Sequence, residues 1–583
     1  MLENKVWYLP LLDNPDDKES MKFDDGEKAS ILLRQFSSVF TREGDEPVPT
    51  IAKRTLTSCS SIQVTVEKVL KDLRGLNQYK SCGPDELHPR LLIELADQIA
   101  LPVSLLFNIT LKKGALPDNW RRAFVSPIYK KGSKHIPENY RPISLTAILC
   151  KIMEKHVRDV VISHLIDNRL LSKKQYGFIS GRSTTTQLLY YLDECTKITA
   201  GGGVVDSIYL DFAKAFDTVP HRRLMGKLES YGIEGDIYNW INAFLHNRTQ
   251  EVVVNGSTSA AAPVISGIPQ GTVLGPVLFV IYINDLLDNI SSGGLMFADD
   301  TKIYRQITSR DDALQLQNDI NKLEEWSKLW QLYFNHEKCH VLTLGKFENT
   351  LHTQRYTVYG NEMEHVSDEK DLGITIDSEL KFEDHISRKV KIANAIVGQM
   401  RRSFSYLDCD TFKRIFVAFV RPHLEYGEAV WSPHLIRNIT ALENVQIRAT
   451  KLVDGLANLT YQERLKRLDL PSLVFRRRRG DLIEMYKHFH TYDRSTLAPS
   501  FKPRDRPSRQ HRFQLHMPQT KDGEYGPQTN FFFQRTTKVW NGLPRYVVDA
   551  ENVNQFKNRL DDFLSLDPQR YDHRGADADN TTN

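Results

Sequence analysis

Two adjacent carboxylates interrupt an apolar, strand-like stretch, and this feature constrains the chain more than any other. The stretch is GLMFADDTKIY, residues 294–304, and the two acids are Asp299 and Asp300. Burying an unpaired carboxylate is costly, and two side by side also repel each other. A β-strand directs successive side chains to opposite faces, so both acids can point the same way only at a turn. We therefore expect a hairpin tip at which a cation neutralises the pair.

A third acid, Asp211, ends another β-rich run at 204–212. If the two runs form adjacent strands, three carboxylates converge. Such hard oxygen ligands suit Mg²⁺, and two ions about 4 Å apart activate an attacking 3′-hydroxyl and stabilise a leaving pyrophosphate. Taken alone, an Asp-Asp pair is more often a turn or a helix cap. The order of the surrounding motifs decides between these interpretations.

The composition is that of a globular protein with several domains: 583 residues, of which 40% are apolar and 26% are charged. Lys and Arg exceed Asp and Glu by 77 − 73 = 4, too few to predict a polyanionic partner. The six cysteines show no paired C-x-x-C spacing, which argues against zinc modules and a disulfide framework. The apolar runs are too short to span a membrane. We expect an intracellular protein, with nucleus or cytoplasm left open, and no membrane partner.

Periodicity predicts an α+β fold in which helices pack behind an antiparallel sheet. After a Pro- and charge-rich linker at 41–52, the pattern is helical, broken by a strand at 124–132 and a loop at 135–144. The letters EVVV and NGS predict a hairpin. Further expected elements are helices at 272–287 and 312–334, a strand at 339–344, helices over about 390–490, and a disordered tail after residue 567.

Four motifs follow one another in a specific order: LDFAKAFD (210–217), SGIPQGTVLGPVLF (266–279), FADD (297–300) and FNHEKC (334–339). This succession resembles the palm of reverse transcriptases, most closely those of jockey-type non-LTR retrotransposons. NYRPISLTAILCKIMEK (139–155), QYGFISGRSTTTQLL (175–189) and DLGITIDSELKF (371–382) extend the resemblance over nearly the whole chain. It implies a right-hand polymerase with an N-terminal extension and linker (1–62), fingers (63–200), a palm with an antiparallel sheet (201–390), a helical thumb (391–495) and a C-terminal extension (496–583).

The resemblance also implies roles for individual residues around the metal. Asp211, Asp299 and Asp300, together with the backbone carbonyl of Phe212, would hold two Mg²⁺ ions, with Mn²⁺ as an alternative ion. Lys338, in NHEKC, matches a lysine that protonates the departing pyrophosphate, a general-acid role. It equally suits a charged turn.

Other matched residues would surround the incoming nucleotide. Phe216 occupies the position of a steric gate that clashes with a 2′-hydroxyl, although a core aromatic is the plain alternative. Gln270 and Gly271 would line the nucleotide site, and Arg141 would clamp the triphosphate with paired bonds to phosphate oxygens. Lys130 or Lys131 would assist. For Asp217 and Asp285, which recur in the motifs, a helix cap or a salt bridge is the first interpretation.

A polymerase must also contact its RNA template and DNA primer through basic groups. Arg182, in GFISGRST, is expected to contact the template backbone. Residues 471–514 contain eleven Lys or Arg against four Asp or Glu, and they include the run Arg476, Arg477, Arg478 and Arg479. We interpret this region as facing the duplex; a solvated basic face or a nuclear signal are the alternatives.

The function implied is RNA-templated DNA synthesis, in which deoxynucleotides are added to a primer 3′-hydroxyl, as in target-primed retrotransposition. The apurinic-type endonuclease usual upstream in these elements has no room before residue 80, so a separate or upstream endonuclease is an expected partner. One alternative is an inactive or domesticated remnant that binds RNA and DNA without synthesis. The other is an RNA-templated RNA polymerase or a relative of telomerase or intron enzymes.

Overall fold

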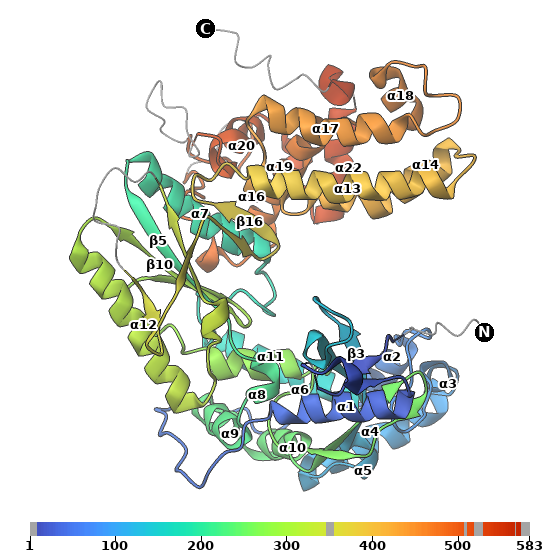
Figure 1. Ribbon diagram of the computed structural model, residues 1–583, viewed down its shortest axis with the longest axis vertical. Helices are drawn as coiled ribbons and strands as arrows, with labels where there is room; N and C mark the ends of the chain where they lie inside the picture. The colour runs from blue at the N-terminus through green and yellow to red at the C-terminus, as the bar shows by residue number, and fades with distance from the viewer. Residues whose placement is uncertain are drawn as a thin grey trace.

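A central five-stranded sheet joins the two lobes of the protein (Figure 1). The computed structural model describes residues 8–14, 16–345, 355–505, 510–517, 529–565 and 567–572. Within these ranges the strand order is β14 (Glu364–Val366), β11 (His340–Leu344), β5 (Val204–Leu210), β10 (Asp300–Ile307) and β9 (Gly293–Phe297). The pairs of β5, β10 and β9 and of β5 and β11 are antiparallel, and β14 adds in parallel. The expected antiparallel sheet is therefore present.

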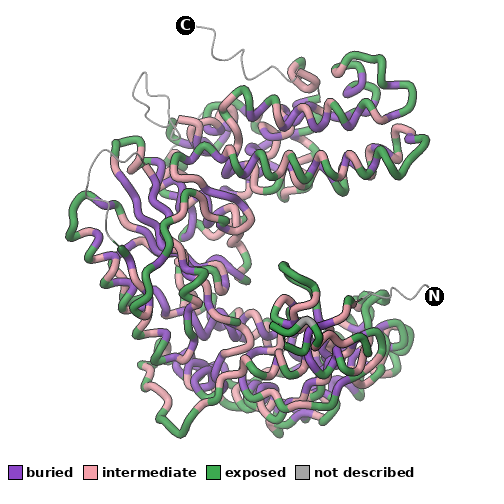
Figure 2. The backbone as a smooth tube through the Cα atoms, viewed as in Figure 1, coloured by how far each residue is buried: buried purple, intermediate pink, exposed green. Residues whose placement is uncertain are grey.

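Helices cover both faces of this sheet. Ile208 and Ile303 belong to a core shared with α11 (Gly275–Ile283) and α12 (Arg310–Trp330). Val205 and Tyr304 point the other way, into a second core shared with α7 (Thr184–Ala200) and the helical lobe. Because side chains alternate along each strand, each strand contributes to both cores, and the middle of the sheet is buried (Figure 2). The expectation placed helices on one face only, because the strand pattern does not reveal what covers the second.

The first lobe surrounds a second five-stranded sheet in the order β4 (Tyr140–Leu145), β3 (Arg122–Tyr129), β6 (Arg248–Val254) and β7 (Ser257–Thr258), with β8 (Ala262–Val264) paired to β6. Asn255 and Gly256 both have positive φ between β6 and β7, as the predicted NG hairpin requires. The helices of this lobe are α1 (Asp25–Ser38), α2 (Val66–Arg74), α3 (Pro89–Glu94), α4 (Ala96–Lys113), α5 (Asp118–Arg121), α6 (Ile148–Asp167), α8 (Ala215–Thr218), α9 (His221–Ser230) and α10 (Gly235–Leu245).

One expectation about loops in this lobe is wrong, and a second segment is anchored to the lobe. The segment 135–144 is not all loop, because it contains most of strand β4. Its Pro142 is tolerated because β4 is the edge strand of its sheet, where a missing N–H costs little. The stretch 41–52 contains no helix or strand, and two contacts anchor it: Glu43 forms an ion pair of 3.1 Å with the buried Arg223 of α9, and the Thr41 N–H bonds Ser266.

The second lobe is helical and lies on the far side of the sheet from α12 (Figure 1). It contains α13 (Glu383–Ser403), α14 (Cys409–Ile415), a π-helical turn (Phe416–Val420), α15 (Arg421–Glu425), α16 (Glu428–Trp431), α17 (Ile436–Thr450), α18 (Tyr461–Leu468), α19 (Leu473–His490), α20 (Phe532–Asn541), α21 (Arg545–Val548) and α22 (Val553–Leu564). α20 and α22 share a core with α13 and α19, so the described C-terminal residues pack into the same lobe.

Three small hairpins complete the fold: β1 (Leu11–Leu12) with β2 (Met21–Lys22), β12 (Thr357–Val358) with β13 (Asn361–Glu362), and β15 (Asp368–Asp371) with β16 (Ile374–Asp377). All six cysteines are free. None of the helices in the described ranges has both the length and the apolar character that crossing a membrane requires. The expected disordered tail falls mainly on 573–583, outside the described residues.

Candidate active site

The three carboxylates of the motifs lie at one end of the central sheet. β9 and β10 form a hairpin whose two-residue turn contains Asp299, and Asp300 is the first residue of β10. β5 is the antiparallel neighbour of β10, and Asp211 follows its last residue. The adjacency of the two strands, inferred from sequence, is therefore observed.

These carboxylates influence one another's ionisation. Burial, and to a smaller extent the charge of Asp211, raises the pKa of Asp299. Burial by surrounding groups, followed by the charges of Asp299, Asp371 and Asp211, raises the pKa of Asp300 to about 6. Like charges held together in this way favour binding of a cation, and carboxylate oxygens are the ligands that Mg²⁺ prefers. The donor set therefore fits a divalent metal ion.

Asp211 also pairs with a lysine. Lys338, in the 3₁₀ turn His336–Lys338, donates from Nζ to Asp211 Oδ2 at 2.7 Å. Across the described ranges, no three Asp, Glu, His or Cys side chains lie close enough together to hold a metal ion. Two contacts hold the segment that carries the lysine next to Asp211. The Asn335 N–H donates to the Asp211 carbonyl at 2.7 Å, and the Phe212 and Phe334 rings stack with centroids 4.5 Å apart.

Basic and acidic side chains line one open cavity of about 460 Å³, among them Lys130, Asp211, Asp300 and Lys338. Burial first, and then the charges of Arg141 and Lys338, lower the pKa of Lys130, while Asp211 opposes the shift. Arg141, on β4, is exposed and has no hydrogen-bond or ion-pair partner among the described residues. Its charge still acts on Asp299, whose carboxyl it helps to ionise. A free guanidinium therefore stands near the acidic edge.

Phe216 lies on α8, five positions after Asp211, and is half-buried. Its ring stacks on Phe279 of α11, with centroids 4.4 Å apart, and meets the edge of Phe178 at 6.4 Å. The ring is thus fixed from two sides while part of it stays exposed. Packing therefore fixes the orientation of this ring.

The loop with Gln270 and Gly271 is fastened to β4 and α8. The Gln270 carbonyl accepts from the Ser144 N–H at 2.7 Å, and its side-chain amide donates to Asp217 at 2.9 Å. Gly271 has φ +100°, and a Cβ there would lie 2.9 Å from the Ser144 carbonyl oxygen, so only glycine fits. The expected cap or salt bridge for Asp217 is wrong, because this carboxylate accepts the Gln270 amide.

Arg182 does not face solvent, so the expected template contact is wrong. Its side chain is 5% exposed and pairs with Asp493 at 3.0 Å. The same guanidinium donates to the carbonyl of Ser172 at 2.6 Å and to the carbonyl of Gln175. The pair with Asp493 joins the segment before α7 to the chain after α19, and the two carbonyl bonds brace that segment internally. Sequence pattern did not reveal the partner, because Asp493 lies 311 residues away.

The run of four arginines does not form a basic face either. It lies within α19, where consecutive side chains are about 100° apart, so four in a row point to all sides of the helix. All four meet carboxylates. Arg476 bonds Glu425 at 2.8 Å, Arg479 bonds Asp561 at 2.6 Å, and the buried Arg477 lies near Glu443 and Glu428. Arg478 is substantially exposed, at 41% of its side chain; it bonds Gln569 and forms an ion pair of 3.9 Å with Asp567.

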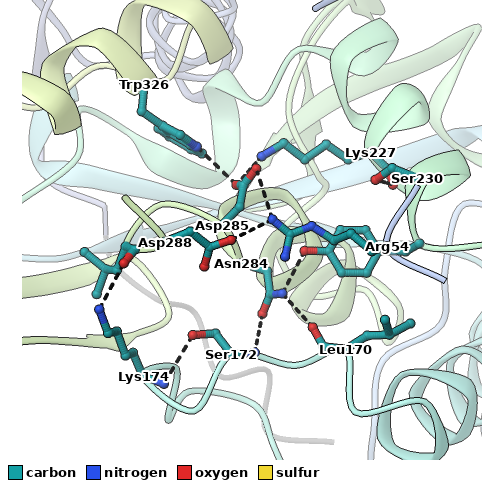
Figure 3. Close-up of polar contacts among 12 residues, drawn as sticks. Arg54, Leu170, Ser172, Lys174, Lys227, Ser230, Asn284, Asp285, Asp288 and Trp326 are labelled. Carbon is teal, nitrogen blue, oxygen red and sulfur yellow. Dashed lines mark hydrogen bonds and ion pairs between the residues drawn. The ribbon is translucent and has the colours of Figure 1, made fainter. Parts of the chain in front are cut away.

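Asp285, just after α11, lies in a polar network with residues of α9 and α12 (Figure 3). It forms an ion pair with the fully buried Lys227 and accepts from Trp326 Nε1 at 3.1 Å. Arg54 adds a bond of 2.7 Å to Asp288 and approaches Asp285 at 4.0 Å. The expected salt bridge at Asp285 is therefore confirmed, and the role of this residue is structural.

Two further residues at the cavity were missed from the sequence. The buried Lys302 of β10 forms an ion pair with Asp371 of β15, and both line the cavity beside Asp300. A lysine inside an apolar strand, as in TKIY, needs a buried partner, and this signal was available in the sequence. Which carboxylate supplies it required the tertiary structure.

Comparison with known proteins agrees with this geometry. Residues 128–392 match the family model described as reverse transcriptase (RNA-dependent DNA polymerase). The chain is 27% identical over 407 residues to the RNA-directed DNA polymerase from mobile element jockey of Drosophila melanogaster, covering 67% of this chain and 44% of that protein. It is 26% identical over 466 residues to the probable RNA-directed DNA polymerase from transposon BS of the same species, covering 77% and 49%.

The jockey polymerase of Drosophila funebris is 27% identical over 442 residues, covering 73% of this chain and 47% of that protein. The chain therefore spans about half the length of these curated relatives. A telomerase structure from Candida tropicalis matches 48% of this chain and 59% of its own at 12% identity with a TM-score of 0.33, a likeness too weak to carry an argument. Residues 128–392 thus match the reverse transcriptase family, and the chain is similar to the polymerases of jockey and other non-LTR elements.

Proposed function

We propose that this chain is an RNA-templated DNA polymerase that adds deoxynucleotides to a primer 3′-hydroxyl, as in target-primed retrotransposition. The observation that carries the proposal is that Asp211 follows the strand next to the hairpin of Asp299 and Asp300, at the same end of the central sheet, in a segment that matches the reverse transcriptase family. In this assignment 63–200 are fingers, 201–390 the palm and 391–495 the thumb. Template, primer and deoxynucleotides are the partners, and the endonuclease acts from a separate or upstream segment.

The three carboxylates and the Phe212 carbonyl would hold divalent ions, two Mg²⁺ in the form we favour. Ions bound there would activate the 3′-hydroxyl and stabilise the leaving pyrophosphate. The three carboxylates would themselves concentrate negative charge at one end of the sheet. Burial, with a smaller contribution from like charges, raises the pKa of Asp299 and Asp300, and a bound cation would offset the repulsion between them.

The basic groups of the cavity would bind the triphosphate. Arg141 supplies a planar guanidinium without a partner among the described residues, which suits bidentate contact with phosphate oxygens. Lys130 stands close enough to Arg141 for their charges to interact, so both would neutralise the same anion. Lys338 would hold the proton that the leaving pyrophosphate takes up, after exchanging its bond with Asp211 for one with phosphate.

Phe216 and the 270–271 loop would select the nucleotide. The fixed ring of Phe216 would exclude a 2′-hydroxyl, and Gly271 would let the backbone approach the substrate closely. This assignment predicts incorporation of deoxynucleotides over ribonucleotides. It also separates the proposal from an RNA-templated RNA polymerase.

The test is extension of a DNA primer on an RNA template with Mg²⁺, comparing wild type with Asp299→Asn. The variant keeps the size of the side chain and removes a metal ligand, so extension should fall by about 10²–10³-fold or more. Asp311→Asn, at an exposed acid in the first turn of α12, is the matched control and should extend normally. Salt-sensitive RNA and DNA binding without extension by wild type would favour the alternative, a remnant that only binds.

A further inference from the structure

A short segment before α7 runs along the hairpin that carries the carboxylate pair. Gln175 and Met296 of β9 form a parallel bridge. The Tyr176 N–H donates to the Met296 carbonyl at 2.7 Å, and the Met296 N–H donates to the Lys174 carbonyl at 2.8 Å. Residues 174–177 therefore extend the sheet locally beyond β9, at the end where Asp299 and Asp300 lie.

One side chain of this segment bonds the turn itself. Gln175 is fully buried, and its Oε1 accepts two backbone N–H groups, from Gly177 at 2.7 Å and from Ala298 at 2.9 Å. Ala298 directly precedes Asp299 in the two-residue turn. The Gln175 Nε2 is buried and has no partner in the described part of the chain. The amide is therefore oriented so that its oxygen is hydrogen-bonded while its nitrogen is not.

The turn needs such support because of its backbone conformation. Ala298 has φ +54°, in the left-handed region that residues with a Cβ avoid, and such a residue persists only where its surroundings over-determine it. Gly177 contributes by close approach: a Cβ on it would lie 2.3 Å from the Ala298 nitrogen. The contact between 174–177 and the turn is therefore specific in shape and in hydrogen bonding.

We infer that Gln175 is a positioning residue that fixes the Ala298–Asp299 turn, and through it the two carboxylates, before any metal or substrate binds. The expected effect on catalysis rests on the proposed polymerase function. The expected effect on the turn rests on the contacts described above alone. It differs from a general role in stability, because the bond is made to the residue next to Asp299. A ligand held by a fixed outer partner binds its metal ion more tightly.

The first experiment needs no activity. Amide hydrogen exchange of the metal-free protein is followed by mass spectrometry in overlapping peptides that isolate residue 298. Gln175→Met keeps the length of the side chain and removes the acceptor, and Gln175→Asn keeps an amide but withdraws it by one methylene. Both should exchange the Ala298 amide about tenfold faster or more than wild type. If one variant fails to fold, the other decides the same question.

The second experiment measures the Mg²⁺ dependence of primer extension. In both variants the Mg²⁺ concentration for half-maximal rate should rise and kcat should fall. The product of the two changes should be about 10–100-fold, and the KM for deoxynucleotide should change less than about twofold. Gln446→Met is the control: this buried glutamine of α17 bonds Tyr461 and Pro471 in the helical lobe. It should lower the melting temperature without changing exchange at residue 298 or the Mg²⁺ midpoint.

Wild-type exchange and a wild-type Mg²⁺ midpoint in the Gln175 variants would overturn the inference. A shift that Gln446→Met reproduces would also overturn it, since the effect would then be general destabilisation. If wild type extends no primer, the proposed function fails, while the exchange measurement still decides whether Gln175 holds the turn.

Discussion

At the scale of single residues, the site combines groups that are fixed by packing with groups that are free to respond. Phe216 belongs to the first kind, because stacking on Phe279 and the edge contact with Phe178 hold its ring. Arg141 belongs to the second, since it is exposed and unpaired in the described part of the chain. A polymerase needs both: a rigid surface to reject the wrong sugar and mobile charge to bind phosphate.

Replacing Phe216 with Val should open the site to ribonucleotides. The smaller side chain leaves space where a 2′-hydroxyl would otherwise clash, so the preference for deoxynucleotides should fall by about tenfold or more. The measurement is the ratio of kcat/KM for a deoxynucleotide and its ribonucleotide in primer extension. Phe419→Val, at an exposed phenylalanine of the helical lobe, should leave the ratio unchanged. An unchanged ratio in the Phe216 variant would remove the gate assignment.

At the scale of elements, the β15–β16 hairpin connects the cavity to the helical lobe. Asp371 of β15 pairs with Lys302 beside the carboxylates, and the Thr375 N–H of β16 donates to His385 Nδ1 of α13 at 3.1 Å. His385 is buried against Trp431, with ring centroids 5.2 Å apart. An accepting ring nitrogen must be unprotonated, so the docking of α13 on this hairpin requires neutral histidine.

This requirement makes the fold sensitive to acid. Burial first, and then the charges of Lys389 and Arg388, lower the pKa of His385 from 6.5 to about 4. The unfolded chain therefore binds more protons between pH 6.5 and 4, and stability falls as the pH drops through that window. Between pH 7 and 5 the loss from this residue should be about 2 kcal/mol.

Urea unfolding at pH 7 and pH 5 checks this prediction. In His385→Asn the side-chain oxygen still accepts the Thr375 N–H but does not titrate, so the difference between the two pH values should shrink by about 2 kcal/mol. His365→Asn, at an exposed histidine, is the control. An equal pH dependence in wild type and His385→Asn would contradict the assignment.

At the scale of the whole molecule, the sheet and the helical lobe are joined through the segment that precedes α7. Arg182 pairs with Asp493, the Asp493 N–H donates to the Gly181 carbonyl at 2.8 Å, and the Tyr176 hydroxyl donates to the Thr496 carbonyl at 2.7 Å. The same segment contains Gln175, which bonds the turn at the carboxylates. The connection between the lobes and the support of the site thus belong to one stretch of chain.

Arg182→Ala should destabilise the protein without weakening its electrostatic contact with nucleic acid. Removing one partner of a mostly buried pair leaves Asp493 without its cation, at a cost of about 3 kcal/mol in the free energy of unfolding. The slope of log K against log[salt] for RNA binding should not change, because a buried arginine displaces no counterions. Arg401→Ala, at an exposed residue of α13, should leave unfolding unchanged. A smaller salt slope in Arg182→Ala would restore the template contact.

Part of the fold and site could be predicted because the signals are local. The NG turn, the strand ending at Asp211 and the acidic pair at a hairpin each follow from short-range rules. The partners of Arg182 and of the arginines in α19 could not be predicted, because a basic residue gives the same sequence signal whether it meets phosphate or a distant carboxylate. Strand β4 was missed because Pro142 normally argues against a strand, and its position at a sheet edge is not visible in the sequence.

By itself the sequence determined which chemistry the chain carries, because residue types and their order along the chain set which acids, lysines and glycines are available. The tertiary structure alone decided which charges remain free. Strand pairing brought Asp211 beside Asp299 and Asp300, and packing neutralised Arg182 and Arg476 while leaving Arg141 open. The physical reason is that ionisation, burial and ion pairing depend on neighbours in space, and most of these neighbours lie far apart in the sequence.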